Sequence, residues 1–183
     1  MNVLRLKVSL IGDCRVGKSC IVGQLVKKYF NTTYQTTLGI DHNTFEVKMK
    51  DTNYTVQIHI LDLTGFSIFR DLVGNQIKES DCILYVYDST NMESFNSLKL
   101  WKDSFQADIS PNCFEILVGN KIDLEKKIVV DETTLKNSAK GMNADYFLVS
   151  AQQAKGIEEM FSFIAKKFYD KYMAFLNNIK NIN

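Results

Sequence analysis

The sequence predicts an α/β protein with a doubly wound, mostly parallel sheet of six strands and one antiparallel edge strand. Two observations lead to this fold class. Short apolar, β-branched runs alternate with segments whose apolar residues recur at helical spacing, as in a parallel sheet covered by helices on both faces. Two further runs, with apolar residues at every second position, flank a polar turn, which is typical of a hairpin. The chain has 183 residues, so we expect one domain over residues 1–183.

The expected elements follow one another along the chain. Buried strands are predicted at residues 4–11, 82–87, 114–118 and 146–149, and the hairpin at 45–49 and 56–60. Helices are predicted at 18–29, along a face marked between residues 95 and 109, and at 157–175. Residues 31–37 are expected to form a polar loop, and residues 64–80 a mobile loop with a short helix.

Composition and charge exclude several classes of function. The formal net charge is +1, so no strong attraction to nucleic acid or to an acidic membrane is expected. Cysteines stand at positions 14, 20, 82 and 113 without CxxC spacing, which indicates reduced thiols and a cytoplasmic location. No apolar stretch approaches the roughly 20 residues that a membrane-spanning helix needs, and the N-terminus lacks the features of a signal peptide.

Residues 12–19, Gly-Asp-Cys-Arg-Val-Gly-Lys-Ser, fit the phosphate-binding pattern GxxxxGK[ST]. They lie between a predicted strand and a predicted helix, where backbone N–H groups and the helix N-terminus attract phosphate oxygens. We expect Lys18 to contact the β- and γ-phosphates and Ser19 to ligate Mg²⁺. The loop by itself predicts only a nucleoside triphosphate. Its candidate contacts with the nucleotide are Asp13, Cys14, Arg15, Val16, Gly17, Lys18, Ser19 and Cys20.

A second motif, Asn120-Lys121-Ile122-Asp123, directly follows a predicted buried strand. A carboxylate at Asp123 can accept hydrogen bonds from both the ring N–H and the exocyclic amine of guanine, a donor pair that adenine lacks. In this setting the motif resembles the NKxD element of Ras-superfamily GTPases. The resemblance covers nearly the whole chain, from about residue 4 to residue 172, and implies the P-loop small GTPase fold.

The same resemblance supplies further base contacts. Ser150 and Ala151 resemble the family's SAK element, whose backbone amides approach the guanine carbonyl, and Gln152 stands in place of the lysine. Phe30 lies where the family places an aromatic ring against the base, although a core phenylalanine that ends the helix is the alternative. The base site implied by the family comprises Phe30, Asn120, Lys121, Asp123, Leu124, Ser150, Ala151 and Gln152.

Within the superfamily the chain is most similar to a divergent Rab. Residues 38–41, Leu-Gly-Ile-Asp, resemble the Rab IGID segment, and residues 87–95 resemble YDxTxxESF. His42 stands where Rabs usually have phenylalanine, and residues 72–75, Leu-Val-Gly-Asn, replace the aromatic run of that family. The resemblance implies a molecular switch in vesicle trafficking that binds effector, exchange-factor and activating proteins through its switch regions.

A GTP switch needs two loops that sense the γ-phosphate. Thr37 matches the switch I threonine of the family, which completes the Mg²⁺ shell, and Tyr34 is expected to close over the phosphates. A solvated loop threonine is the alternative for Thr37. Residues 62–65 match DxxG, so Asp62 is expected to hold Mg²⁺ through water and Gly65 to sense the γ-phosphate. The metal residues are therefore Ser19, Thr37 and Asp62, and the catalytic residues Lys18, Thr37 and Gly65.

Phe66 departs from the family, because it occupies the place of the glutamine that orients the attacking water. A phenyl ring has no donor or acceptor, so we expect slow GTP hydrolysis. Arg15 replaces a residue that is usually small. Its cation can stabilise the γ-phosphate in cis, block the arginine of an activating protein, or point to solvent.

Two rival functions remain at this stage. The first is a catalytically inactive pseudo-GTPase that acts as a nucleotide-stabilised interaction module, and the second is another P-loop enzyme such as an ATPase or nucleotide kinase. The guanine motif argues against the second. No cysteine follows Cys113, so no CaaX-type lipid anchor is expected on the chain as given. A peripheral location on endomembranes is expected only if a longer chain carries an anchor.

Overall fold

The structure is a computed structural model that describes residues 2–33, 35–66 and 70–180. The strands are β1 (Asn2–Ile11), β2 (Ile40–Lys48), β3 (Tyr54–Leu63), β4 (Cys82–Asp88), β5 (Phe114–Asn120) and β6 (Asp145–Leu148). They form one six-stranded sheet in the order β2-β3-β1-β4-β5-β6. Only the β2–β3 pair is antiparallel, and β2 lies at the edge. The predicted fold class is confirmed.

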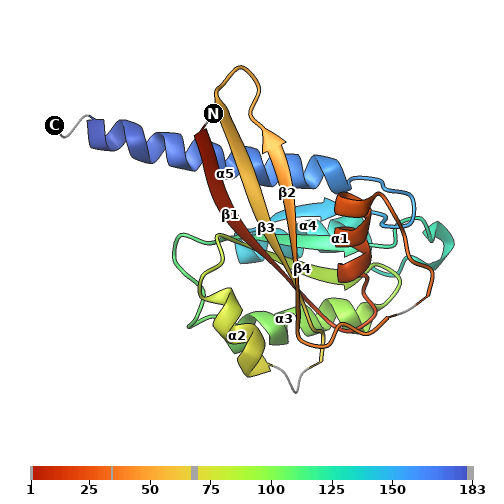
Figure 1. The fold of residues 1–183 in the computed structure, drawn as a ribbon. Helices are drawn as coiled ribbons and strands as arrows, with labels where there is room; N and C mark the ends of the chain where they lie inside the picture. The colour runs from red at the N-terminus through yellow and green to blue at the C-terminus, as the bar shows by residue number, and fades with distance from the viewer. Residues whose placement is uncertain (1, 34, 67–69, 181–183) are drawn as a thin grey trace.

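Helices cover both faces of this sheet (Figure 1). They are α1 (Lys18–Lys27), α2 (Arg70–Ile77), α3 (Met92–Phe105), α4 (Glu132–Met142) and α5 (Ile157–Lys180), with a 3₁₀ turn, η2, at Glu125–Lys127. Helices α1 and α5 share one apolar core with the residues of β1, β3 and β4 at even positions. Helices α2, α3 and α4 share the other core with the residues that point to the opposite face. Side chains that alternate along each buried strand therefore pack into two separate cores.

Helix α1 is shorter than the sequence predicts. Its helical spacing extends to Tyr29, but the helix ends at Lys27 because Lys28 adopts a left-handed conformation with φ of 52°. Tyr29 is consequently 61% exposed rather than part of the buried face. A non-glycine residue in this conformation ends a helix, since it turns the next carbonyl groups away from the helix axis.

Helix α4 was not among the predicted elements. It begins after Asp131, whose side chain accepts a hydrogen bond from the Thr134 amide, and it ends at Asn143 in the left-handed conformation. Leu135 and Ala139 are its two buried residues, in an otherwise polar stretch. Two apolar positions are too few for a periodic pattern, and the capping residues were the signal that pointed to a helix here.

The remaining boundaries differ by a few residues. β3 is longer than predicted at both ends, and β2 begins earlier than predicted. β6 begins and ends one residue earlier, and α5 continues to Lys180. Because β3 continues to Leu63, Asp62 lies within the strand rather than in the loop after it. Among the described residues, no helix is long and apolar enough to cross a bilayer.

Candidate nucleotide-binding site

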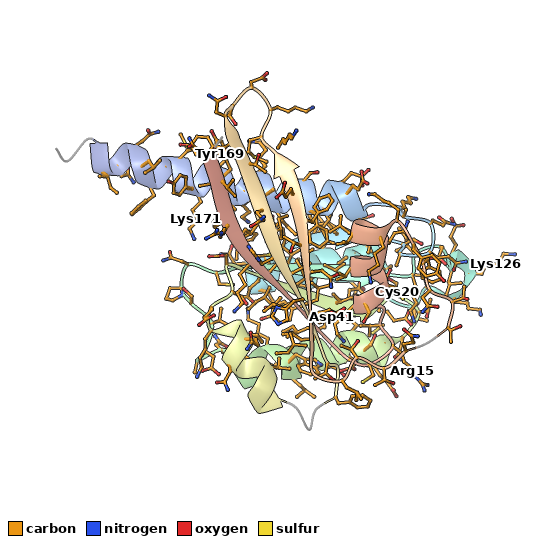
Figure 2. The ribbon with its side chains drawn as sticks, in the orientation of Figure 1. Arg15, Cys20, Asp41, Lys126, Tyr169 and Lys171 are labelled. Atoms are coloured by element: carbon orange, nitrogen blue, oxygen red, sulfur yellow. The ribbon has the colours of Figure 1, made fainter. Side chains whose placement is uncertain are left out.

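A cleft of about 730 Å³ opens where the parallel strands end. Its walls are the loops that follow β1, β3, β5 and β6, together with the segment between α1 and β2. Arg15, Cys20 and Asp41 come from three different segments and all lie at this end of the sheet (Figure 2). The carboxyl ends of parallel strands are the usual ligand site of doubly wound sheets, and the volume suits a small molecule such as a nucleotide.

The loop between β1 and α1 has a shape that only its glycines allow. Gly12 has φ of 138°, and a Cβ atom on it would lie 2.1 Å from the carbonyl oxygen of Val86. Gly17 has φ of 97°, and its Cβ would lie 2.3 Å from Nδ2 of Asn120. The loop therefore passes directly against β4 and against Asn120, the first residue of the motif at residues 120–123 (the base motif). The first turn of α1 receives no side-chain cap from the described residues, so its N–H groups face the loop and can bind an anion.

Lys18 is held inside this loop. Its Nζ donates hydrogen bonds to the carbonyl oxygens of Gly12 at 2.7 Å and Asp13 at 2.9 Å, and the residue is only 6% exposed. Burial lowers the pKa of Lys18, while the nearby Asp62 carboxylate opposes that change. The ammonium group is therefore fixed at the floor of the cleft, where a phosphate would compensate its lost hydration.

Three oxygen donors meet beside Lys18. Ser19 Oγ and Thr37 Oγ1 are 2.9 Å apart and joined by a hydrogen bond, although they come from α1 and from the loop before β2. Asp62 is 2% exposed, and its Oδ1 is buried with no hydrogen-bond partner among the residues that the structure describes. Burial raises the pKa of Asp62, and Ser19 and Lys18 counteract this increase. Two hydroxyls and a carboxylate are oxygen ligands of the type that Mg²⁺ takes, so the donor set fits this ion.

The base motif is tied to the neighbouring loops by Asn120. Its Nδ2 donates to the carbonyl oxygen of Val16 at 2.9 Å, and its Oδ1 accepts from the Ala151 amide at 3.1 Å. Asp123 Oδ1 in turn accepts a hydrogen bond from Ser150 Oγ at 2.5 Å. Asn120 is 2% exposed, and both the nitrogen and the oxygen of its side-chain amide are used for these internal contacts. The arrangement fixes the position of the Asp123 carboxylate at one end of the cleft.

Lys121 spans the cleft between the base motif and the phosphate loop. Its Nζ donates to Oδ2 of Asp88 at 2.6 Å and to the carbonyl oxygen of Arg15 at 2.8 Å. Burial alone would raise the pKa of Asp88, but hydrogen bonds from Lys121 and Thr90 outweigh it and lower that pKa. Asp88 was not among the predicted site residues. Its position at the carboxyl end of β4, next to the other functional loops, was the available signal.

The segment that follows β3 reaches the β1–α1 loop at Gly65. A Cβ atom on Gly65 would lie 2.5 Å from the Cys14 amide nitrogen, so this residue packs directly on the loop backbone. Phe66 follows it, lines the cleft and is 38% exposed. Arg15 also lines the cleft and is exposed, with φ of 66°. Tyr34 lies outside the described residues.

The structure brings most of the candidate residues to one cleft. Those that line it are Cys14, Arg15, Gly17, Lys18, Ser19, Cys20, Phe30, Thr37, Asp62, Gly65, Asn120, Lys121, Asp123, Leu124, Ala151 and Gln152. Asp13, Val16 and Ser150 do not line it, but support it through the hydrogen bonds to Lys18, Asn120 and Asp123. Phe30 is consistent with both alternatives, a base contact and a core residue. It lines the cleft and also packs against the core shared by α1 and α5.

Comparison with known proteins agrees with this geometry. Residues 7–170 match the Ras family. The chain is 35% identical over 167 residues to the Ypt/Rab-type GTPase Rab7 of Neurospora crassa, which covers 88% of this chain and 80% of that protein. It is 36% identical over 169 residues to the Ras-related protein Rab7 of Pisum sativum, covering 88% and 81%.

A third relative is longer. The chain is 34% identical over 163 residues to DnaJ homolog subfamily C member 27 of Danio rerio, and this match covers 86% of the chain but only 59% of that protein. The chain thus spans about three fifths of this relative, whereas it spans most of the two Rab7 proteins. From the matched family, the sheet order and the cleft together, we conclude that this chain belongs to the Ras family and is a Rab-like small GTPase.

Proposed function

We propose that this protein is a guanine-nucleotide switch that binds GTP or GDP with Mg²⁺, hydrolyses GTP slowly and acts in vesicle trafficking. The observation that carries the proposal of slow turnover is the position of Phe66, which lines the cleft directly after Gly65. The family membership and the similarity to Rab7 proteins support the switch and its trafficking role.

Guanine selection is assigned to Asp123. Ser150 holds one carboxylate oxygen by a 2.5 Å hydrogen bond, and Asn120 joins this part of the cleft to the phosphate loop. A fixed carboxylate binds guanine through its N–H donors and rejects adenine, because adenine would leave the charge without partners. Leu124 and Gln152 also line the cleft.

Phosphate binding is assigned to Lys18 and the N-terminus of α1, and the metal to Ser19, Thr37 and Asp62. When bound, Mg²⁺ would neutralise charge on the β- and γ-phosphates. The chain itself binds and orients: the fixed ammonium of Lys18 and the backbone N–H groups of the loop stabilise negative charge that develops on the phosphate oxygens. Gly65, packed against the loop, is the residue through which a γ-phosphate would be sensed.

Among the described residues, the proposed site lacks the glutamine that positions the attacking water in this family. Phe66 presents carbon atoms at the place where the family's glutamine presents an amide, so it cannot orient a water molecule. This observation also favours the second candidate, a pseudo-GTPase that binds nucleotide without turnover. Identification of the co-purified nucleotide by HPLC, followed by single-turnover GTP hydrolysis, separates the two functions. A rate of GTP hydrolysis indistinguishable from the rate in buffer without protein would favour the pseudo-GTPase.

Partner proteins are assigned to the rim of the cleft. Leu38 is 78% exposed and Phe66 is 38% exposed, so two apolar side chains of the switch segments face solvent there. Exposed apolar side chains next to a nucleotide site are suited to effector, exchange-factor and activating proteins whose binding depends on the nucleotide.

Phe66→Gln is the direct test of slow turnover. The amide should position the attacking water and raise the single-turnover rate about tenfold, which corresponds to about 1.4 kcal/mol of barrier. Phe66→Leu is the matched control, because it also removes the ring but supplies no hydrogen-bonding group. If wild type is as fast as a glutamine-containing relative, or if Phe66→Gln leaves the rate unchanged with nucleotide affinity intact, the assignment is wrong.

A further inference from the structure

Asp13 is an acidic residue within a loop assigned to bind phosphate. Its main chain belongs to the cleft floor, since its carbonyl oxygen accepts a hydrogen bond from Lys18 Nζ at 2.9 Å. Gly65 packs on the same main chain, because a Cβ on Gly65 would lie 2.6 Å from the carbonyl carbon of Asp13. A carboxylate on this residue would repel a nucleoside diphosphate or triphosphate if it turned toward the cleft.

The carboxylate is instead held by Trp101 of α3. The indole Nε1–H donates a hydrogen bond of 2.8 Å to Asp13 Oδ1, across 88 residues of sequence. Neither Asp13 nor Trp101 lines the cleft. A neutral donor bonded to a carboxylate gives a charge-assisted hydrogen bond, which is stronger than one between two neutral groups.

Trp101 itself is firmly placed. It is 2% exposed, and its ring lies 6.1 Å from that of Phe105 one turn later on α3. The direction of the indole N–H is therefore set where Trp101 is packed, in the core between α3 and the sheet. A rigid element thus determines where the Asp13 side chain points.

We propose that Trp101 is a positioning residue for the phosphate loop: its indole N–H holds the Asp13 carboxylate against α3 and away from the phosphates. The proposal rests on the proposed function, because it requires a nucleotide in the cleft. Trp101 acts through Asp13 and does not touch the ligand. Its loss frees the carboxylate to rotate, which weakens the binding of GDP and GTP and loosens the main chain that Lys18 and Gly65 contact.

The test measures release of a fluorescent N-methylanthraniloyl-GDP from the full chain. Trp101→Phe keeps an aromatic ring but removes the N–H, and should accelerate release about tenfold. In an Asp13→Asn background the same substitution should change release by less than about twofold, since an amide carries no charge to repel phosphate. Leu98→Met is the matched control: Leu98 is also buried on α3, at 3% exposed, and the change conserves volume.

A merely structural role gives a different result. If Trp101→Phe accelerates release equally in the wild-type and Asp13→Asn backgrounds, Trp101 acts through packing and the positioning role is wrong. Unchanged release in Trp101→Phe, with normal GDP binding by wild type, overturns the positioning role alone. Failure of wild type to bind the GDP probe overturns the proposed function as well.

A second measurement does not depend on the folding of the Trp101 variant. Trp101 is the only tryptophan of the chain, so the ¹H–¹⁵N NMR spectrum contains a single indole cross-peak. In wild type this N–H should exchange slowly with solvent. Asp13→Ala should shift the cross-peak upfield and accelerate its exchange, because the acceptor is lost. An unmoved cross-peak in Asp13→Ala would contradict the hydrogen bond on which the proposal rests.

Discussion

Asp123 and Ser150 show how one residue pair fixes a carboxylate at one end of the cleft. The two residues are 27 positions apart in sequence, yet Ser150 Oγ donates to Asp123 Oδ1 at 2.5 Å. Ser150 is fully buried, so its hydroxyl keeps a fixed direction. The carboxylate is therefore oriented before a nucleotide arrives, and little conformational entropy is lost when the base binds.

Asp123→Asn should exchange guanine preference for xanthine preference. The amide presents a donor where guanine presents its amine, so GDP binding should weaken about 100-fold, or about 2.8 kcal/mol. The carbonyl at C2 of xanthine suits that donor, so binding of xanthosine diphosphate should improve. Isothermal titration calorimetry with both nucleotides is the measurement. Asp51→Asn, the same change in the exposed β2–β3 turn, should alter neither affinity. Equal binding of GDP and ADP by wild type would end the guanine assignment.

At the scale of elements, the helices α3 and α4 begin with side-chain caps, whereas α1 does not. Asn91 Oδ1 accepts hydrogen bonds from the amides of Glu93 at 2.9 Å and Ser94 at 3.2 Å at the start of α3. Asp131 caps α4 in the same way. Capped amides are satisfied within the protein, whereas the amides at the start of α1 are available to an anion, as the proposed phosphate binding requires.

Asn91→Ala should destabilise the protein by about 1 kcal/mol, because two amides at the start of α3 lose their acceptor. Urea unfolding monitored by circular dichroism gives the free energy of unfolding. Asn96→Ala is the matched control within α3: Asn96 is exposed, and alanine has the higher helix propensity. A loss of stability in Asn96→Ala as large as that in Asn91→Ala would show that the cap is not its cause.

At the scale of the whole molecule, the cleft joins segments that are remote in sequence, so a ligand there holds several elements together. A nucleotide at 1,000 times its Kd should add about 4.1 kcal/mol to the free energy of unfolding. For a domain of this size that is a rise in Tm of roughly 8–16 °C.

The measurement is differential scanning fluorimetry with GDP, with and without Mg²⁺, and with ADP as the control nucleotide. The increase should be largest for GDP with Mg²⁺, smaller after chelation of the ion, and close to zero for ADP. An equal increase with and without Mg²⁺ would argue against the metal role of Ser19, Thr37 and Asp62.

The sequence by itself determined the class of fold and predicted which residues line the cleft. Periodicity is a local property, so it identified the six strands and most helices, and the motifs at residues 12–19 and 120–123 predicted side chains that line the cleft. Local signals failed where a pattern was too short or ended early. Helix α4 buries only Leu135 and Ala139, and α1 stops at Lys28 because of a backbone conformation that no side-chain periodicity encodes.

Only the tertiary structure decided which residues hold the residues of the site in place. The bonds from Trp101 to Asp13, from Lys121 to Asp88 and from Ser150 to Asp123 span 88, 33 and 27 residues. Each depends on how α3 packs against the sheet or on how neighbouring strands pair within it. A hydrogen bond requires an approach within about 3 Å and a defined angle, and packing of distant elements sets both. Sequence spacing therefore predicts the residues that line the cleft better than the residues that hold them in place.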